Sequence, residues 1–487
     1  MRIRSLLAGL TATCVLSSCA FLLDFDELQT DTGDASAGGQ SGDSGLGGGG
    51  GASGSSGSGG GGQDAGGADG GDAGPECAVP GDCNDQDSLT SDDCVAGTCK
   101  YAADAKLVED GFQVDTAAPY LRRVTLAAGG STFYLSTYRG NLLNPTLYET
   151  AISSFSATGT TATLKTIPAT ALLPPKEGGT ETPVSAVGMM ADTSGVHAFF
   201  ATTPGALQGN VWYARLDGDL VPAAPAGLIG NGYSAGDVVR YPVPGRVDND
   251  IVAYWIAGGG DIKIAGPTKT FSAAAVGAQY AAPLFATGQP SMFMLRASDN
   301  SQFFYQVGAK MDGLKDCNPQ PNTTWGPLAV TSPAPGLAFV GFSSSFFGGS
   351  VSEVRTVACD GNGCAVSDQC DTSTALTNGR NPALDSEVAS VSLKSGVRIR
   401  VASVLGAADG SKTSLGLVVS FLDIGSQGES FGIYPTAGVV VEQPGNKAET
   451  ADLPAVSLLG DRVAVAWIDG KEGAQMLHVR RYRLAKQ

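Results

Sequence analysis

The sequence predicts an all-β fold over residues 101–487, a β-propeller of about seven blades, with six to eight blades compatible with the pattern. Two observations lead to this prediction. Apolar, strand-like runs such as residues 251–256 and 463–467 alternate with Gly, Asn, Asp and Pro residues that mark turns. A unit consisting of a lead-in, a strand, a turn and a second strand also recurs along this region.

The clearest copy of this unit starts at Pro454, passes through the strand 463–467 and a turn at Asp469-Gly470, and ends in the strand 477–482. Further copies start near Val124, Val184, Pro244, Pro283, Pro335 and Val388. Seven units share the 387 residues that follow residue 100 (487 − 100), or about 55 residues each. A propeller blade uses roughly 40–50 residues, so seven slightly long blades fit.

A ring also solves a physical problem of such units. One four-stranded sheet cannot cover both of its faces, whereas a closed ring packs each sheet between two others and leaves short edges. The last strand, residues 477–484, needs a partner to close the ring. We expect that partner in the segment after Ala102, around residues 111–114. Two packed β-sandwiches are the alternative architecture.

The N-terminal segment predicts export. Arg2 and Arg4 precede an apolar run, residues 6–16, which is shorter than the roughly 20 residues that span a bilayer as a helix. The run ends in Leu16-Ser17-Ser18-Cys19, which resembles the lipobox of bacterial lipoproteins. This resemblance implies that residues 1–18 are a signal peptide, and that Cys19 becomes the acylated first residue.

Ala20 follows Cys19, and the absence of Asp there resembles an outer-membrane sorting signal. The expected address is therefore the cell envelope, with the lipid in the outer membrane. Residues 19–75 form a Gly-, Ser- and Asp-rich tether that cannot bury enough apolar surface to order itself. About 45 such residues span roughly 35–40 Å on average.

Charge is concentrated outside the predicted propeller. Residues 1–100 carry −12 of the formal charge of −17. We expect no nucleic acid as a partner, because phosphate binding needs clustered Lys and Arg. The one basic cluster, Arg480, Arg481 and Arg483, is interpreted as the polar face of the last strand.

Residues 76–100 form a separate Cys- and Asp-rich module. They resemble small modules with a Cys-Thr-x-Asp-x-Cys core on surface proteins of gliding soil bacteria and slime moulds, but Leu89 stands where those modules carry a Cys. A solvated, disulfide-stapled loop is the preferred interpretation. The alternative is a Ca²⁺ site, for which carboxylate oxygens are available on Asp82, Asp85, Asp87, Asp92 and Asp93.

Eight cysteines remain after Cys14 leaves with the signal and Cys19 is acylated. An even number of cysteines in an exported protein predicts disulfides. They fall into two groups, Cys77, Cys83, Cys94 and Cys99, then Cys317, Cys359, Cys364 and Cys370. Pairing within each group stays open. For the second group a zinc site is the alternative, and a hairpin bridged at its base by Cys359 and Cys364 is preferred.

No residue set predicts catalysis. Gly232-Tyr233-Ser234-Ala235-Gly236 matches the nucleophile elbow of α/β-hydrolases, but a strand, not a helix, is expected after it. His197 and His478 are the only histidines, so a His-based metal site is not expected. Many carboxylates fall at predicted turns and are interpreted as solvated, and examples are Asp217, Asp219, Asp248, Asp250, Asp261 and Asp469.

These features predict a lipid-anchored envelope protein that binds or scaffolds an envelope glycan or another envelope protein. No catalytic residue, metal or cofactor is expected beyond the Ca²⁺ alternative. The alternative function is a polysaccharide-acting hydrolase or lyase on the same scaffold. A cluster of aromatic residues at one mouth of the ring, drawn from Trp212, Trp255 and Trp325, would mark a binding site.

Overall fold

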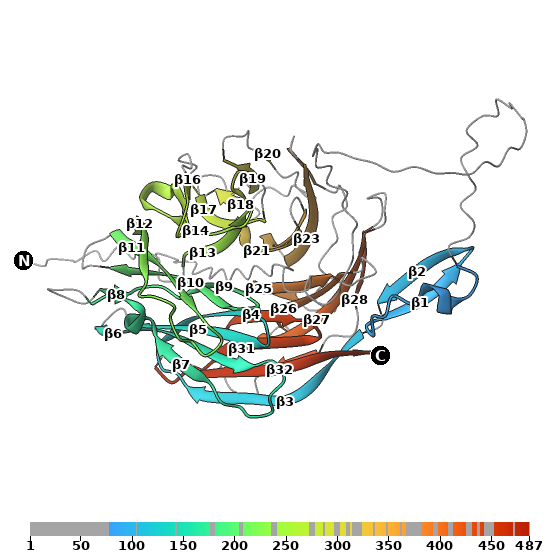
Figure 1. Cartoon of the computed structure of the whole chain (residues 1–487), viewed down its shortest axis with the longest axis horizontal. Helices are drawn as coiled ribbons and strands as arrows, with labels where there is room; N and C mark the ends of the chain where they lie inside the picture. Colours follow the sequence, from blue (N-terminus) through green and yellow to red (C-terminus); the bar gives the residue numbers. More distant parts are fainter. Residues whose placement is uncertain are drawn as a thin grey trace, which may run out of the picture.

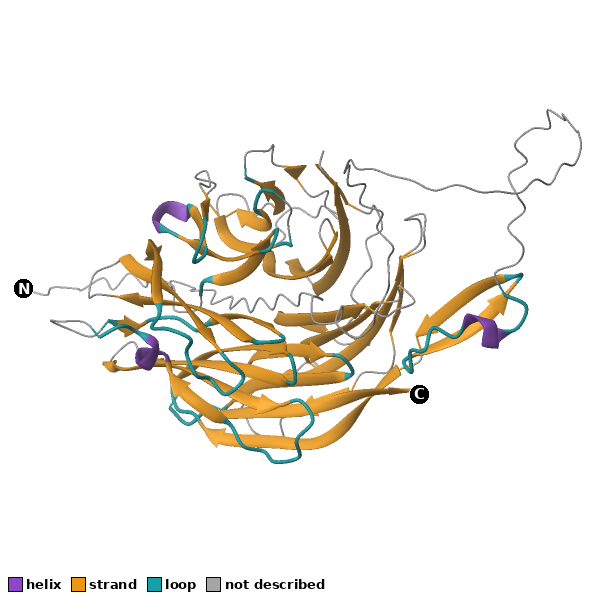
Figure 2. Cartoon of the chain, in the orientation of Figure 1, coloured by secondary structure: helices purple, strands orange, loops and turns teal. Residues whose placement is uncertain are grey.

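A computed structural model describes residues 77–103, 105–141, 144–175, 181–203, 208–234, 241–271, 278–285, 288–296, 302–307, 452–470 and 473–486. Between residues 312 and 442 it describes strands only, through their backbone (Figure 1). Helix in the described residues is limited to short 3₁₀ turns (Figure 2). None of the described residues forms a helix with the length and apolarity needed to cross a membrane.

The described strands of the body form seven antiparallel sheets of four or five strands, which we call blades 1 to 7. Blade 1 consists of β4 (Leu121–Gly129), β5 (Thr132–Asn141), β6 (Asn144–Ser156) and β7 (Lys165–Pro168). Blade 2 consists of β8 (Thr182–Pro183), β9 (Gly188–Asp192), β10 (Gly195–Thr203), β11 (Gln208–Leu216) and β12 (Gly227–Ser234). Blade 3 consists of β13 (Val243–Val247), β14 (Asp250–Ile256), β15 (Ile262–Ala265) and β16 (Thr270–Phe271).

Blade 4 consists of β17 (Ala278–Pro283), β18 (Ser291–Arg296), β19 (Gln302–Gln306) and β20 (Asp312–Gly313). Blade 5 consists of β21 (Thr324–Ala334), β22 (Leu337–Phe346), β23 (Gly349–Asp360) and β24 (Gly363–Val366). Blade 6 consists of β25 (Asn381–Ser392), β26 (Arg398–Ala407), β27 (Thr413–Ile424), β28 (Phe431–Pro435) and β29 (Val439–Glu442). Blade 7 consists of β30 (Asp452–Leu459), β31 (Arg462–Asp469), β32 (Met476–Lys486) and β3 (Ala105–Ala117).

The blades form a ring through one inner strand of each sheet. β4 contacts β9, β9 contacts β13, and the series continues through β17, β21, β25 and β30 until β30 contacts β4 again. Each sheet therefore packs beside the next one instead of stacking as two flat layers, and Figure 1 shows the blades following the colour order of the chain. The propeller prediction with seven blades is confirmed, and the paired-sandwich alternative is wrong.

The predicted repeat starts agree with the first strands of most blades. Val124, Val184, Pro244, Val388 and Pro454 lie in or beside such strands, whereas the start at Pro283 falls late, at the last residue of β17. The start near Pro335 is wrong, because that residue lies between β21 and β22. Strand β21 contains Pro327 and Pro333, and prolines inside a run weaken its strand signal.

The two ends of the propeller chain close blade 7 together. β3 pairs with the last strand, β32, and Val114 lies opposite Val479. The expected closing segment after Ala102 is confirmed. Because β3 lies at the outer edge of the C-terminal sheet, its ladder joins the first and last parts of the ring in one sheet.

A bulge in β3 serves a buried arginine. The ladder shifts between Glu109 and Gln113, and Gly111 adopts a φ of +79°, a left-handed value that favours glycine. Across from the bulge, the side chain of Arg481 is 1% exposed and forms an ion pair with Asp110. Its guanidinium carbon lies 5.0 Å from the centre of the Phe112 ring. The polar-face interpretation is therefore wrong for Arg481, because the bulge provides a buried anion for it.

The core is divided into layers between blades. Alternate residues of β11 point to opposite faces of blade 2. Ala214 and Leu216 pack with blade 1 residues such as Ile152, while Val211 packs with Trp255 of blade 3. This alternation fixes which β11 side chains face each neighbour, and it positions the site described below.

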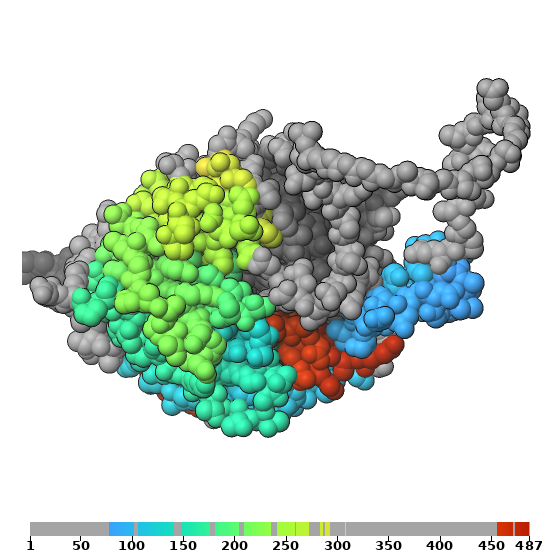
Figure 3. Space-filling view, in the orientation of Figure 1, coloured from blue at the N-terminus to red at the C-terminus, as the bar shows by residue number. Residues whose placement is uncertain are grey.

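The Cys- and Asp-rich module is a small two-disulfide unit. It contains the 3₁₀ turn η2 (Pro80–Cys83) and the hairpin of β1 (Thr90–Val95) and β2 (Thr98–Ala103). It extends from the body beside the C-terminal strand, drawn in blue and red in Figure 3. Leu89 is 6% exposed and belongs to the same apolar cluster as Leu107 and Leu484 of blade 7. The position that departs from the Cys pattern therefore anchors the module to the propeller.

Candidate functional site

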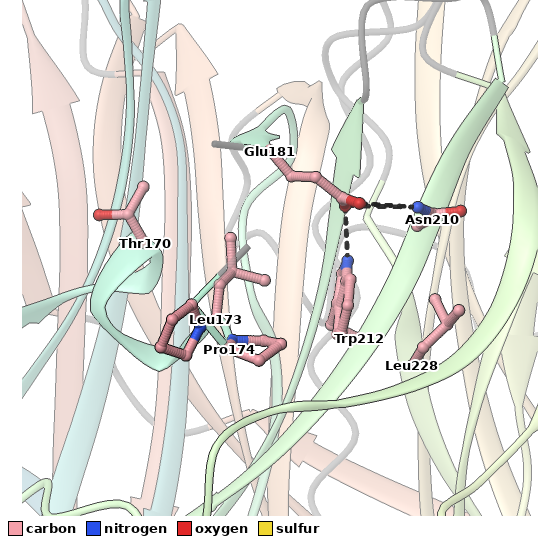
Figure 4. A pocket seen from close by; sticks show the side chains of 8 residues that line it. Thr170, Leu173, Pro174, Glu181, Asn210, Trp212 and Leu228 are labelled. Carbon is pink, nitrogen blue, oxygen red and sulfur yellow. Dashed lines mark hydrogen bonds between the residues drawn. The ribbon is translucent and has the colours of Figure 1, made fainter. Parts of the chain in front are cut away.

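A pocket lies between blades 1 and 2, and we call it the interblade pocket (Figure 4). Its volume is about 470 Å³, within the range of roughly 300–1,000 Å³ that is usual for small-molecule sites. The described residues that line it are Thr170, Leu173, Pro174, Pro175, Glu181, Asn210, Trp212 and Leu228.

The periodicity of strands places the pocket walls. Asn210 and Trp212 share a face of β11 with Ala214, so they point toward blade 1. Leu228 of β12 lies directly opposite Trp212 in the ladder. The first wall of the pocket is therefore the outer part of blade 2.

The second wall comes from the connection that leaves blade 1. The 3₁₀ turn η3 (Ala169–Leu172) buries Ala169 and Leu172 in the layer between the two blades. The backbone N–H of Ala226 donates to the Leu172 carbonyl at 2.7 Å, which fixes the end of the turn beside β12. Blades diverge outward from the axis of a ring, so this turn fills part of the widening gap, and the pocket is the rest of it.

Glu181 provides a buried, hydrogen-bonded carboxylate at the pocket. It is 7% exposed. Its carboxylate accepts hydrogen bonds from Asn210 Nδ2 at 3.1 Å and from Trp212 Nε1 at 3.0 Å, as Figure 4 shows, and also from the Thr202 hydroxyl. Trp212 Nε1 lies 2.8 Å from the Thr202 hydroxyl as well. These bonds hold the carboxylate and the indole in fixed positions.

The hydrogen-bonded residues beside the pocket lie at one end of blade 2. Thr202 and Thr203, at the end of β10, pair with β8, and the chain enters blade 2 there. Asn210 lies near the start of β11, at the same end. In a propeller this end gathers the entry segments of the blades and the loops between their second and third strands, so several loops meet at it.

The described lining of the pocket contains a single carboxyl group. Glu181 is the only acidic residue among its described lining residues. Glycoside hydrolysis uses two carboxyl groups, about 5 Å apart in retaining enzymes and about 6.5–9.5 Å apart in inverting ones. One fixed acceptor beside apolar walls can orient a ligand, but it does not make such a pair.

The first group of cysteines forms two disulfides. Cys77 bonds to Cys94 and Cys83 bonds to Cys99. In the second group, the β23–β24 ladder places Cys359 opposite Cys364, in the hairpin that the sequence predicts. Their bond stays a prediction. Cys19, Cys317 and Cys370 lie outside the described residues.

The carboxylates of the module mainly accept backbone hydrogen bonds. Asp82 accepts from the N–H groups of Ala78 and Val79, which lowers the pKa of its carboxyl. Asp85 accepts from Asp87 N–H at 2.8 Å. In the part of the chain that the structure describes, the one group of three close metal-ligating residues is Cys77, Cys83 and Cys99, all disulfide-bonded. The Ca²⁺ alternative stays a prediction.

Both histidines lie in strands and have carboxylate partners. His197 of β10 contacts Asp192 at 3.1 Å and the Tyr213 hydroxyl at 2.9 Å. Burial lowers the pKa of His197. His478 of β32 lies 2.6 Å from Asp115 and stacks on Trp467. These contacts fit the interpretation of both as strand residues.

The remaining candidates do not converge on the pocket. Ser234 of the Gly-x-Ser-x-Gly motif is the last residue of β12, and the segment after it lies outside the described residues. The turn carboxylates that the structure describes lie at several different turns. Asp217, for example, accepts the N–H of Val221 at 2.8 Å, and Asp248 accepts that of Gly288 at 2.8 Å.

Of the three tryptophans, Trp212 lines the pocket. Trp255 is 4% exposed and packs between blades 2 and 3, so it does not join Trp212. The side chain of Trp325 lies outside the described part. Sequence reasoning missed Glu181, because its hydrogen-bond partners lie 21 to 31 positions further along the chain. No local pattern marks that residue.

No family model matches this chain, and no curated protein matches it. Solved structures resemble it at low identity. A Trypanosoma rangeli sialidase matches at 10% identity with a TM-score of 0.37, over 79% of this chain and 56% of that one. AofleA from Arthrobotrys oligospora matches at 9% identity with a TM-score of 0.33, over 68% and 91%. The polysaccharide lyase Uly1 matches at 10% identity with a TM-score of 0.27, over 74% and 89%. The chain thus spans just over half the length of the sialidase.

Proposed function

We propose that this chain is a lipid-anchored protein of the cell envelope, held in the outer membrane through Cys19. Its propeller binds or scaffolds an envelope glycan or another envelope protein, and the interblade pocket is the ligand site. The observation that carries the binding role is a fixed, buried carboxylate, Glu181, at the edge of apolar walls. Such a combination is typical of ligand pockets that are formed before the ligand arrives.

The anchor rests on the lipobox resemblance and on the tether that follows it. Metabolic labelling with an alkyne fatty acid, followed by membrane fractionation, tests it. We expect the wild-type chain to carry label and to sediment with membranes, whereas Cys19→Ser carries none. Cys14→Ser is the matched control and keeps its label. Label on Cys19→Ser would contradict the anchor.

The binding role is tested with the full-length chain in a detergent without a sugar headgroup. Immobilised chain is incubated with purified envelope polysaccharides and with envelope proteins, and retention is compared between variants. Leu228→Ala removes a pocket wall that is 56% exposed, and Val221→Ala changes a residue of similar exposure, 57%, outside the pocket lining. We expect retention to fall only for Leu228→Ala. Equal retention by both variants contradicts the role of the pocket.

The same polysaccharides discriminate binding from catalysis. A hydrolase or lyase releases new chain ends over time, which a reducing-end assay measures. We expect none. Release that stops in Glu181→Gln would contradict the binding role and support the polysaccharide-acting alternative.

A further inference from the structure

The two kinds of wall in the interblade pocket define a ligand with two kinds of surface. Leu173, Pro174, Trp212 and Leu228 provide apolar contact, while Glu181 and Asn210 provide hydrogen bonding at one side (Figure 4). A ligand that fills this site needs an apolar face and, next to it, an edge of hydrogen-bond donors. A pyranose ring has this form, because its C–H groups make one face apolar and its hydroxyls surround the edge.

The orientation of Trp212 supports this match. The indole Nε1–H is directed at Glu181 and Thr202, at 3.0 and 2.8 Å. Since hydrogen bonds to Nε1–H lie at the ring edge, the faces of the ring are left for apolar packing. The face of an aromatic ring carries negative charge density and attracts C–H groups. Trp212 can therefore pack against the C–H face of a sugar.

The fixed carboxylate supplies the polar part of the match. Among the described residues, three side chains donate to Glu181, so a ligand hydroxyl that donates to it meets an acceptor that is already held in position. A group that is held before binding loses little conformational freedom when the ligand arrives. Asn210 reaches Glu181 through its amide nitrogen, and in Figure 4 its amide oxygen points away from that carboxylate.

The negative charge of Glu181 restricts which sugars the pocket can bind. A uronic acid or another anionic sugar would bring its carboxylate close to Glu181, and like charges at short distance repel. Cation recognition by aromatic cages uses several rings, whereas Trp212 is the only aromatic residue among the described lining residues. Both considerations favour a neutral sugar.

We propose, on the basis of the binding role above, that the interblade pocket binds a neutral pyranose residue of a glycan. The sugar packs its C–H face on Trp212 and Leu228 and donates a hydroxyl to Glu181. The volume of about 470 Å³ suits one or two sugar rings. A free saccharide of that size is expected to bind with a Kd of roughly 10 µM to a few mM, from the usual affinity per atom of small ligands.

The test uses the full-length chain in the same detergent and titrates it with neutral monosaccharides and disaccharides. Glucuronate and n-butylammonium serve as the anionic and cationic probes. Saturation-transfer NMR and calorimetry report binding. We expect a neutral sugar to bind and glucuronate to bind at least tenfold more weakly. Glu181→Gln should weaken sugar binding at least tenfold and Leu228→Ala several-fold, while Val221→Ala has no effect.

Leu228→Ala keeps the test valid if Glu181→Gln fails to fold, because Leu228 is largely exposed. Binding of n-butylammonium alone, lost in Glu181→Gln, overturns the inference in favour of a cation site. Sugar binding that survives both pocket variants places the sugar elsewhere, which overturns the inference and leaves an envelope-glycan role standing. If the immobilised chain retains envelope material but binds no free sugar, the inference is overturned and the envelope-binding role still stands. Absence of every ligand overturns the proposed function as well.

Discussion

Cys94 and Cys99 lie directly opposite each other in the β1–β2 hairpin, yet neither bonds to the other. Each bonds instead to a cysteine of the preceding segment, Cys77 or Cys83. Both disulfides therefore connect the hairpin to the segment before it, and neither disulfide joins β1 to β2. This arrangement holds the acidic segment 80–89 close to the hairpin.

We predict that non-reducing peptide mapping recovers the pairs Cys77–Cys94 and Cys83–Cys99. Serine substitution of both Cys83 and Cys99 should destabilise the module by about 2–4 kcal/mol, because the loop that the bond closes becomes free in the unfolded state. The loss of stability is measured by unfolding the full chain in urea, with proteolytic cleavage inside the module as the readout of its unfolding. A peptide linked through Cys94 and Cys99 would contradict the pairing.

A second prediction concerns the buried pair of Asp110 and Arg481. We expect Asp110→Asn to lower the free energy of unfolding by about 3–5 kcal/mol, because a guanidinium stays buried after losing its charge partner. Arg481→Met in the Asp110→Asn background should recover part of that loss. Arg483→Met, at an exposed position of the same strand, is the control. Chemical denaturation measures the three variants against the wild-type chain, and a loss below 1 kcal/mol in Asp110→Asn would show that the pair is not buried in solution.

The β3–β32 ladder predicts a pH effect. Burial opposes the ionisation of Asp115, but hydrogen bonds from Arg480, Gln113 and His478 outweigh it and lower the pKa of its carboxyl to about 2. Because that pKa is lower than in the unfolded chain, the stabilisation is complete above about pH 4. It is lost as the pH falls from about 4 to about 2.

Asp115 is partly exposed, so screening limits its contribution to about 1 kcal/mol. We predict that Asp115→Asn lowers the melting temperature at pH 6, and that this difference disappears near pH 2. Glu149→Gln is the control, since Glu149 is 58% exposed and lies 3.9 Å from Arg139. Calorimetry over pH 2–6 measures both, and a difference that persists unchanged at pH 2 contradicts the assignment.

A further prediction concerns Leu89 and the stability of the contact between the module and the propeller. We expect Leu89→Ala to cost about 2–4 kcal/mol of the contact between module and propeller, from lost apolar burial and the cavity left behind. Trypsin should then cut faster at Lys106, beside the junction, while the main unfolding transition stays in place. Val95→Ala, at a site that is 50% exposed, is the control. Unchanged cleavage in Leu89→Ala would show that Leu89 does not anchor the module.

Much of the fold was predictable from the sequence, because strand patterns are local and the repeat was visible through several starting points. The closing segment around Val114 also followed from a general requirement, a partner for the last strand. The start near Pro335 failed for a physical reason. Leu337 begins the second strand of its blade, and the prolines of β21 hid the first.

The candidate site was less accessible. The alternation of side chains along β11 places Trp212 on the face toward blade 1. Whether a pocket forms there depends on the pairing of β11 with β12 and on the position of η3, which are not local properties of the sequence. Glu181 is defined by partners from two other strands. The burial of Arg481 was also not predictable from the sequence. A basic residue in a strand is expected to be exposed unless the bulge in the opposite strand is known.

Strand β3 follows the module almost immediately and lies along β32 for most of its length. If Cys19 fixes the chain to a membrane, any drag on a ligand held by the propeller is transmitted through the stapled module into this strand. A pull along the strand axis stresses the hydrogen bonds of the ladder together, as in shear, rather than one after another, as in peeling. Blade 7 would then carry the mechanical load between the membrane and the ligand. The bonds Cys77–Cys94 and Cys83–Cys99 would limit how far the module before β3 can extend under that load.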